Sequence, residues 1–90
     1  MINTKEIFSK NLEMELKLRN ISQEQLGKAI GVSQQSISEW VKGKSLPSLD
    51  TFRNLCIALR ADPEIMLDLD IETEVPFAMH KLLENPIVHT

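Results

Sequence analysis

Two serine-capped helices separated by a glycine turn are the feature that most constrains how this 90-residue chain folds. Ser22 is followed three residues later by Gln25, the pattern of a capping box, and Ser33 is a second N-cap signal. Gly31, between them, supplies the left-handed residue that ends the first helix. Residues 23–41 therefore predict two helices of about eight residues, joined by a turn too short for an antiparallel arrangement.

Three more helices are predicted around this pair, because further cap signals divide the chain. The first begins at Asn3 or Thr4 and ends near Asn20, a fourth follows Ser48, and a fifth follows Asp62. The apolar spacing of all five helices assigns one face to the core. The residues expected to face the core are Ile7, Phe8, Leu12, Leu16, Leu18, Leu26, Ala29, Ile30, Ile37, Trp40, Val41, Leu49, Phe52, Leu55, Cys56, Leu59, Ile65, Met66 and Leu69.

The helix that follows Ser22 is short, and we expect it to bury Leu26, Ala29 and Ile30. The absence of any apolar alternation of period two along the sequence argues against strands. The sequence thus predicts an all-α, five-helix domain over residues 1–70. Residues 71–90 are predicted to be an acidic and apolar C-terminal tail, in which Pro76 to Leu83 is compatible with another short helix.

Charge is divided unevenly along the chain. Residues 1–60 hold nine Lys or Arg and six Asp or Glu, whereas residues 61–90 hold one Lys and seven Asp or Glu. The whole chain has a net charge of −3, but its body is basic and its end is acidic. A basic body is compatible with a nucleic-acid partner. Two solvated faces of opposite sign explain the same pattern equally well.

Several classes of function are disfavoured by the composition. The longest apolar run, Leu55 to Leu59, is far too short to span a membrane. Cys56 has no second cysteine to pair with, which favours a cytoplasmic location. His80 and His89 do not combine with it at metal-ligand spacing, so we expect no metal and no cofactor. Without a nucleophile–base pair or a phosphate-binding glycine loop, the chain is not expected to be an enzyme.

The chemically informative surface is the outer face of the helix from Gln34 to Val41. Gln34, Gln35, Ser38 and Glu39 lie opposite the apolar face of this helix. A glutamine amide donates and accepts at once, which matches the N6 and N7 edge of adenine in the major groove. Residues at the start of the second helix of such a pair are the ones that reach base edges. The alternative is that these are ordinary solvent-facing polar residues.

From Ile21 to Trp40, and through Lys42 to Pro47, the sequence resembles the phage repressor/Cro-like, XRE-type helix-turn-helix family of prokaryotic and phage regulators. The resemblance covers roughly residues 5–70. It implies a repressor-like DNA-binding domain with its helix-turn-helix at the second and third helices. It also implies a homodimer on a palindromic operator in double-stranded DNA, acting in transcription regulation as a repressor.

The resemblance also implies roles for individual residues. Gln35 and Glu39 would read base edges, with Gln34 and Ser38 beside them, and Gln23 would contact a phosphate and brace Gln34. The residues implied to hold the DNA backbone are Ser33, Lys42, Lys44 and Ser45. For the two lysines, the alternative is that they only complement the negative end of the third helix.

Two departures from the family pattern stand out. The family commonly pairs an arginine in the first helix with a glutamate near the end of the third, and these positions hold Leu16 and Val41 here. An apolar pair avoids the desolvation cost of a buried ion pair, so we expect the fold to be preserved. Glu39 is a carboxylate on a face expected to meet phosphates, which is unfavourable unless it accepts from a cytosine N4 amine.

The tail supports a second hypothesis for the function of the chain. Its apolar residues are many for a linker, and they suit folding back on the body, self-association or a protein partner; they are Ile71, Val75, Phe77, Met79, Leu82, Leu83, Ile87 and Val88. Of these, we favour self-association through the fifth helix and the tail. The alternative function is an antitoxin or regulatory interaction module whose residues 71–90 bind a partner protein.

Overall fold

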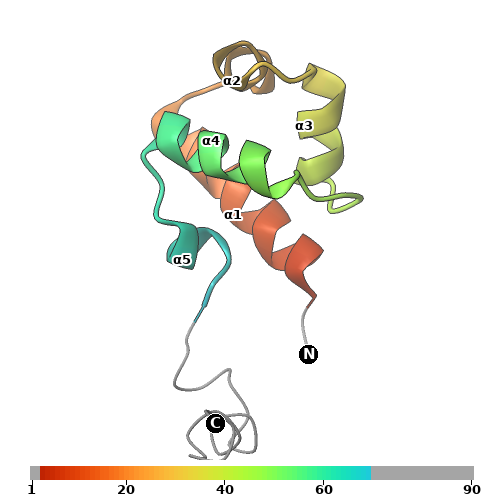
Figure 1. Ribbon diagram of the computed structural model, residues 1–90, viewed down its shortest axis with the longest axis vertical. Helices are drawn as coiled ribbons and strands as arrows, with labels where there is room; N and C mark the ends of the chain where they lie inside the picture. Colours follow the sequence, from red (N-terminus) through yellow and green to blue (C-terminus); the bar gives the residue numbers. More distant parts are fainter. Residues whose placement is uncertain (1–2, 70–90) are drawn as a thin grey trace, which may run out of the picture.

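The computed structural model describes residues 3–69, which form five α-helices. They are α1 (Thr4–Arg19), α2 (Gln23–Ile30), α3 (Gln34–Val41), α4 (Leu49–Leu59) and α5 (Pro63–Met66). The helix α3 packs against α1 and α2, α4 packs against α2, and α5 packs against α1 (Figure 1). The predicted all-α, five-helix architecture is confirmed. The predictions for residues 71–90 lie outside the described residues.

Each helix begins at a side-chain cap, because the first backbone amides of a helix have no partner within it. The Ser22 hydroxyl accepts from the Gln25 amide at 3.0 Å, and the Gln25 side chain accepts from the Ser22 amide at 2.8 Å. This is the capping box that the sequence predicts. At the start of α1 the cap is Asn3 rather than Thr4, since the Asn3 side chain accepts from the Glu6 amide. The N-caps of the remaining helices are Ser33, Ser48 and Asp62, as predicted.

The helices also end in one common way. After each helix one residue adopts the left-handed conformation, and the next amide donates to the carbonyl five residues earlier. Glycine favours this conformation, and Gly31 and Gly43 end α2 and α3 as expected. The other left-handed residues carry side chains and are Asn20, Arg60 and Asp68. Because each helix ends in such a compact turn, the connections between helices are short. Each turn therefore sets the direction in which the next helix begins.

Phe8 of α1 lies at the centre of the core and is fully buried. Its ring meets Trp40 of α3 edge to face, with centroids 6.4 Å apart, and Phe52 of α4 in the same way at 5.9 Å. Such aromatic pairs favour edge-to-face geometry. One residue thus joins three helices. The buried core residues are Phe8, Leu12, Leu16, Leu26, Ile37, Trp40, Leu55, Cys56, Leu59 and Met66.

Cys56 is 5% exposed and belongs to this core, as expected from its position on α4. Burial raises the pKa of the Cys56 thiol, and the negative charge of Asp62 raises it further. The thiol is therefore protonated at neutral pH and packs as a small apolar side chain.

Five residues predicted to face the core are instead exposed: Leu18, Ala29, Leu49, Ile65 and Leu69. Leu18 stands two positions after the buried Leu16, which places it on the opposite side of α1. In α2 the inward side is formed by Leu26 and Gly27, and Ala29 lies beyond its edge. These two predictions were wrong because Leu18 and Ala29 lie outside the part of their helices that faces the core.

The other three exposed residues have a different cause. The helix α5 is a single turn that ends at Met66, so it buries Met66 while Ile65 points away and Leu69 follows after the helix has ended. At the start of α4, Leu49 is 84% exposed because no other described element covers that side of the helix. Apolar spacing alone does not reveal which face of a terminal turn is covered.

Gly27 is required by close packing within the turn between α2 and α3. A Cβ atom at Gly27 would lie 2.7 Å from the carbonyl oxygen of Val32, closer than nonbonded atoms approach. Gly31 is different, since its φ of 72° demands a left-handed conformation but nothing lies within 4 Å of an added Cβ. One glycine is thus needed for space and the other for backbone conformation.

We predict that Gly27→Val lowers the free energy of unfolding by roughly 3 kcal/mol, because the side chain forces the turn apart. As a control, Gly31→Ala should cost about 1 kcal/mol, the penalty of a left-handed residue with a side chain. Urea unfolding followed by circular dichroism measures both values. Equal losses in the two variants would contradict the assignment of Gly27 to close packing.

Candidate nucleic-acid interface

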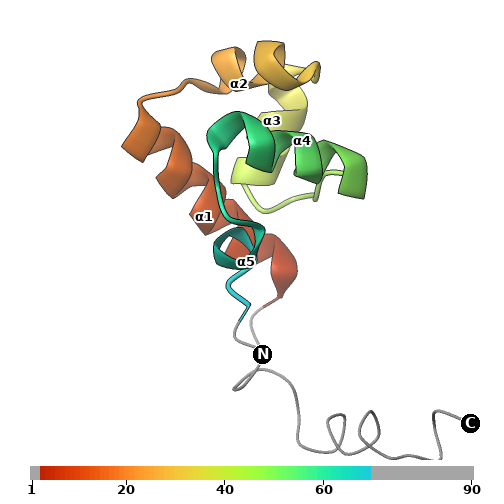
Figure 2. The ribbon, with the colours of Figure 1, turned by 60° about the vertical axis from the view of Figure 1, so that its left-hand side comes forward.

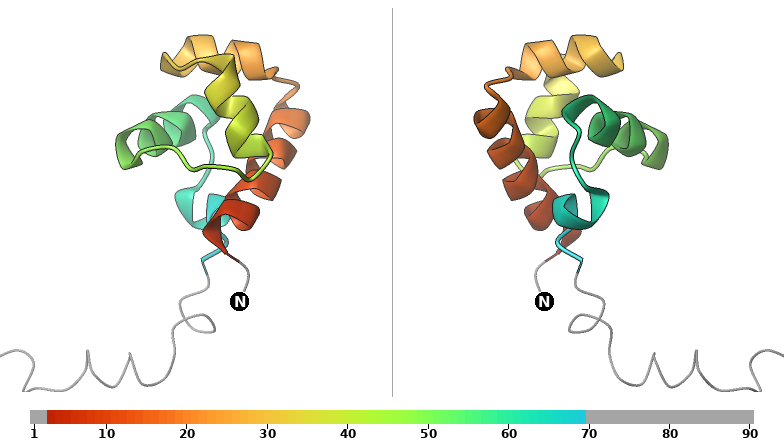
Figure 3. Two further views of the ribbon diagram at one scale, coloured as in Figure 1. Left: turned by 90° about the vertical axis from the view of Figure 1, so that its right-hand side faces the viewer. Right: turned by 90° about the vertical axis from the view of Figure 1, so that its left-hand side faces the viewer.

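The helix α2 lies across the N-terminal end of α3 and crosses it steeply (Figures 2 and 3). The helix α3 lies at the surface (Figure 3, left). The inward side of α3 buries Ile37 and Trp40. On the opposite side the structure brings together the predicted base-reading residues, of which two are exposed and two are half-buried: Gln34, Gln35, Ser38 and Glu39. The outer face of α3, defined by these four residues, is therefore polar and accessible.

Both ends of α3 are held in place. At its start the Ser33 hydroxyl accepts from the Ser36 amide at 3.1 Å. At its end the hydroxyl of Ser9, in α1, donates to the carbonyl of Val41, which has no partner further along α3. Ser9 was not predicted from the sequence, because its partner lies 32 residues away and no local pattern marks such a contact.

The segment after α3 turns sharply and carries the predicted phosphate-binding residues. Lys42 caps α3, Gly43 adopts a φ of 74°, and the amide of Lys44 donates to the carbonyl of Glu39 at 2.9 Å. Lys42 and Lys44 are exposed and Ser45 is half-buried. Two flexible cations thus extend from the C-terminal end of α3.

The ion pairs of the described residues leave these two lysines without a carboxylate partner. The three pairs join residues four apart on one helix: Glu13–Lys17, Glu15–Arg19 and Glu24–Lys28. All lie in α1 or α2, so no salt bridge within residues 3–69 includes a charged side chain of α3 or its connector. Lys42 follows Glu39 by about one helical turn and partly offsets its negative charge.

Two of the predicted contacts are constrained by the geometry. Gln23 is half-buried at the first position of α2, and no hydrogen bond joins it to Gln34 within the described part of the chain. The Ser33 hydroxyl caps α3 and lies 3.0 Å from the Ser36 hydroxyl, so it is already engaged. The bracing of Gln34 by Gln23 stays a prediction for the DNA-bound state.

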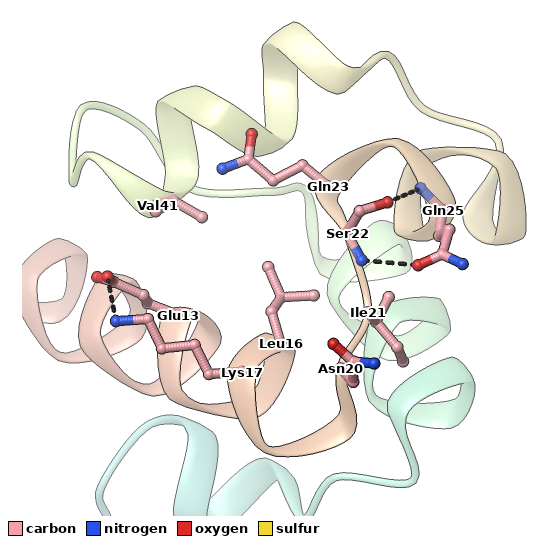
Figure 4. A pocket seen from close by; sticks show the side chains of 9 residues that line it. All are labelled: Glu13, Leu16, Lys17, Asn20, Ile21, Ser22, Gln23, Gln25 and Val41. Carbon is pink, nitrogen blue, oxygen red and sulfur yellow. Dashed lines mark hydrogen bonds and ion pairs between the residues drawn. The ribbon is translucent and has the colours of Figure 1, made fainter.

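Gln23 also borders an open hollow of about 630 Å³ between α1, α2 and α3 (Figure 4). Leu16 from α1 and Val41 from α3 line this hollow, at the positions where the family pattern has an ion pair. Leu16 belongs to the buried core and Val41 packs against it. Apolar side chains therefore replace the ion pair at these positions of α1 and α3, and the fold is preserved as expected.

Two short helices joined by a tight turn, with the second exposing a polar face, define a helix-turn-helix DNA-binding domain. Comparison with known families agrees, since residues 12–66 match the helix-turn-helix family. This chain belongs to that family, the XRE-type helix-turn-helix of Cro-like and repressor-like proteins. It is accordingly a DNA-binding transcription regulator of the XRE type. No curated protein and no solved structure matches the chain.

Among residues 3–69, no helix is long and apolar enough to cross a membrane. No group of three His, Cys, Asp or Glu side chains that could hold a metal ion lies within that range. The helix-turn-helix family binds DNA and is typically not enzymatic.

We predict that Ser9→Ala lowers the free energy of unfolding by about 1 kcal/mol, because the carbonyl of Val41 loses its donor. Ser38→Ala is the matched control: its side chain makes no hydrogen bond among the described residues, and the change should stay within about 0.5 kcal/mol. Urea unfolding compares the two variants. Indistinguishable stabilities would show that the hydroxyl of Ser9 does not hold α3.

Proposed function

We propose that this regulator represses transcription by binding a palindromic operator as a homodimer, with α3 of each copy in the major groove. One observation carries the proposal: Gln34, Gln35, Ser38 and Glu39 share the outer face of α3, opposite its buried side. Polar side chains that donate and accept hydrogen bonds, presented on a rigid helix, suit direct reading of base edges.

Within this face, each side chain suits a particular contact. Gln35 is exposed in the first turn of α3, and its amide pairs with the N6 and N7 atoms of adenine. Gln34 and Ser38 lie beside it and add contacts to the neighbouring bases. The carboxylate of Glu39 accepts from the N4 amine of cytosine, which compensates its repulsion by phosphates.

The residues around this face suit the DNA backbone. Lys42 and Lys44 supply positive charge at the C-terminal end of α3, and Ser45 follows them in the connector. Gln23 stands at the N-terminus of α2, where the amides and the helix dipole favour a phosphate. Ser33 stands at the N-terminus of α3, where the helix favours a phosphate for the same reason. These contacts fix the position of the domain and leave sequence selection to the outer face of α3.

A homodimer and repression fit the size of the domain. One copy presents a single reading helix of eight residues, which covers only a few base pairs. Two copies related by a two-fold axis read two half-sites about one helical turn apart. Occupation of a promoter by such a dimer is sufficient to exclude other proteins, so repression requires no further machinery in the chain.

We predict that Gln35→Ala weakens binding to the preferred operator by about 1–3 kcal/mol and relaxes the preference at one base position in each half-site. Selection from random duplex DNA, followed by titration, measures both effects. Asn54→Ala removes an exposed amide from α4 and serves as the control, with no change in either quantity. An unaltered base preference in Gln35→Ala would overturn the base-reading role.

Lys44→Ala should weaken binding to all DNA sequences alike, because a phosphate contact carries no base information. We expect the slope of log K against log salt concentration to become shallower by about one per protomer. Lys28→Ala, which removes a cation already paired with Glu24, should leave the slope unchanged. The phosphate contact would be contradicted if the two variants had the same slope.

A further inference from the structure

The outer side of α4 carries two large apolar side chains that no other described element covers. Leu49, Arg53 and Ile57 follow one another at intervals of four and therefore lie in one stripe along the helix. Leu49 is 84% exposed and Ile57 is 60% exposed. Two large apolar side chains held in one stripe favour removal from water by a partner.

An open groove of about 640 Å³ adjoins this stripe, between α4 and the start of α5. Phe52, Cys56 and Pro63 line it together with residues of the stripe. The stripe and the groove, here called the α4 surface, thus combine projecting apolar side chains with a depression that can receive apolar side chains. A surface with both features can bind a copy of itself.

The charges on the α4 surface have the same self-complementary character. Asp50 and Arg53 both line the groove and carry opposite charges. Neither forms an ion pair with another residue of the described chain. A two-fold axis passing between their positions brings Asp50 of each copy to Arg53 of the other, which makes two equivalent ion pairs.

We propose that the α4 surface binds a second copy of this chain, with a two-fold axis close to Asp50 and Arg53. The proposal rests on the proposed function, since it names the surface through which the homodimer forms. The arrangement leaves the reading helix uncovered: the N-terminal end of α4 projects beside α3, on the side away from α1 (Figure 3, left). Each copy therefore keeps the outer face of α3 available for DNA.

The first test compares two leucines with similar exposure, one within the α4 surface and one outside it. Leu49→Glu places a charge in the proposed interface, whereas Leu18→Glu makes the same change on α1, where Leu18 is 74% exposed. Sedimentation of the full chain without DNA measures the dimer dissociation constant. We expect it to rise about tenfold or more in Leu49→Glu and to stay within about twofold in Leu18→Glu. A monomeric wild-type chain, or an unaffected Leu49→Glu, would overturn the proposal.

The second test exchanges the two charges. Asp50→Arg and Arg53→Asp should each weaken self-association, because each variant places like charges opposite one another twice. The double variant restores opposite charges across the axis and should regain most of the wild-type association. Since it keeps both changes, its recovery also shows that neither change disrupts the fold. A double variant as weak as the single variants would contradict the two-fold pairing.

Because these measurements contain no DNA, and Gln35→Ala should self-associate like the wild type, failure of the interface is distinguishable from failure of DNA binding.

Discussion

The close approach of Gly27 to the carbonyl of Val32 is the constraint on which the rest of the structure depends. It holds the turn between α2 and α3 tight, and the turn sets the direction in which α3 leaves. Only in this direction do Ile37 and Trp40 enter the core while the hydroxyl of Ser9 meets the carbonyl of Val41. The exposure of the outer face of α3 is a consequence of this packing.

Much of the fold could be predicted because its boundaries are encoded locally. A cap such as Ser22 with Gln25, or a stop such as Gly31, depends on residues within one turn of the chain. Left-handed residues with side chains, such as Arg60, carry no comparable signal. The outer face of α3 was predictable for the same local reason, since its residues share one short helix.

The remaining features depend on contacts between distant segments. No pattern near Ser9 indicates that its hydroxyl meets the end of α3, and none near Leu49 indicates which side of α4 is covered. At Leu16 and Val41 the sequence did indicate apolar side chains in place of an ion pair, and both line the hollow between α1, α2 and α3.

The central claim is that the outer face of α3 reads DNA, and nuclear magnetic resonance tests it most directly. The side-chain amides of Gln34 and Gln35 give separate signals that can be followed while a selected operator duplex is added to the labelled protein. We expect these signals to shift strongly with the operator and much less with a scrambled duplex of equal length. Equal shifts with both duplexes, or shifts confined to other helices, would contradict the account.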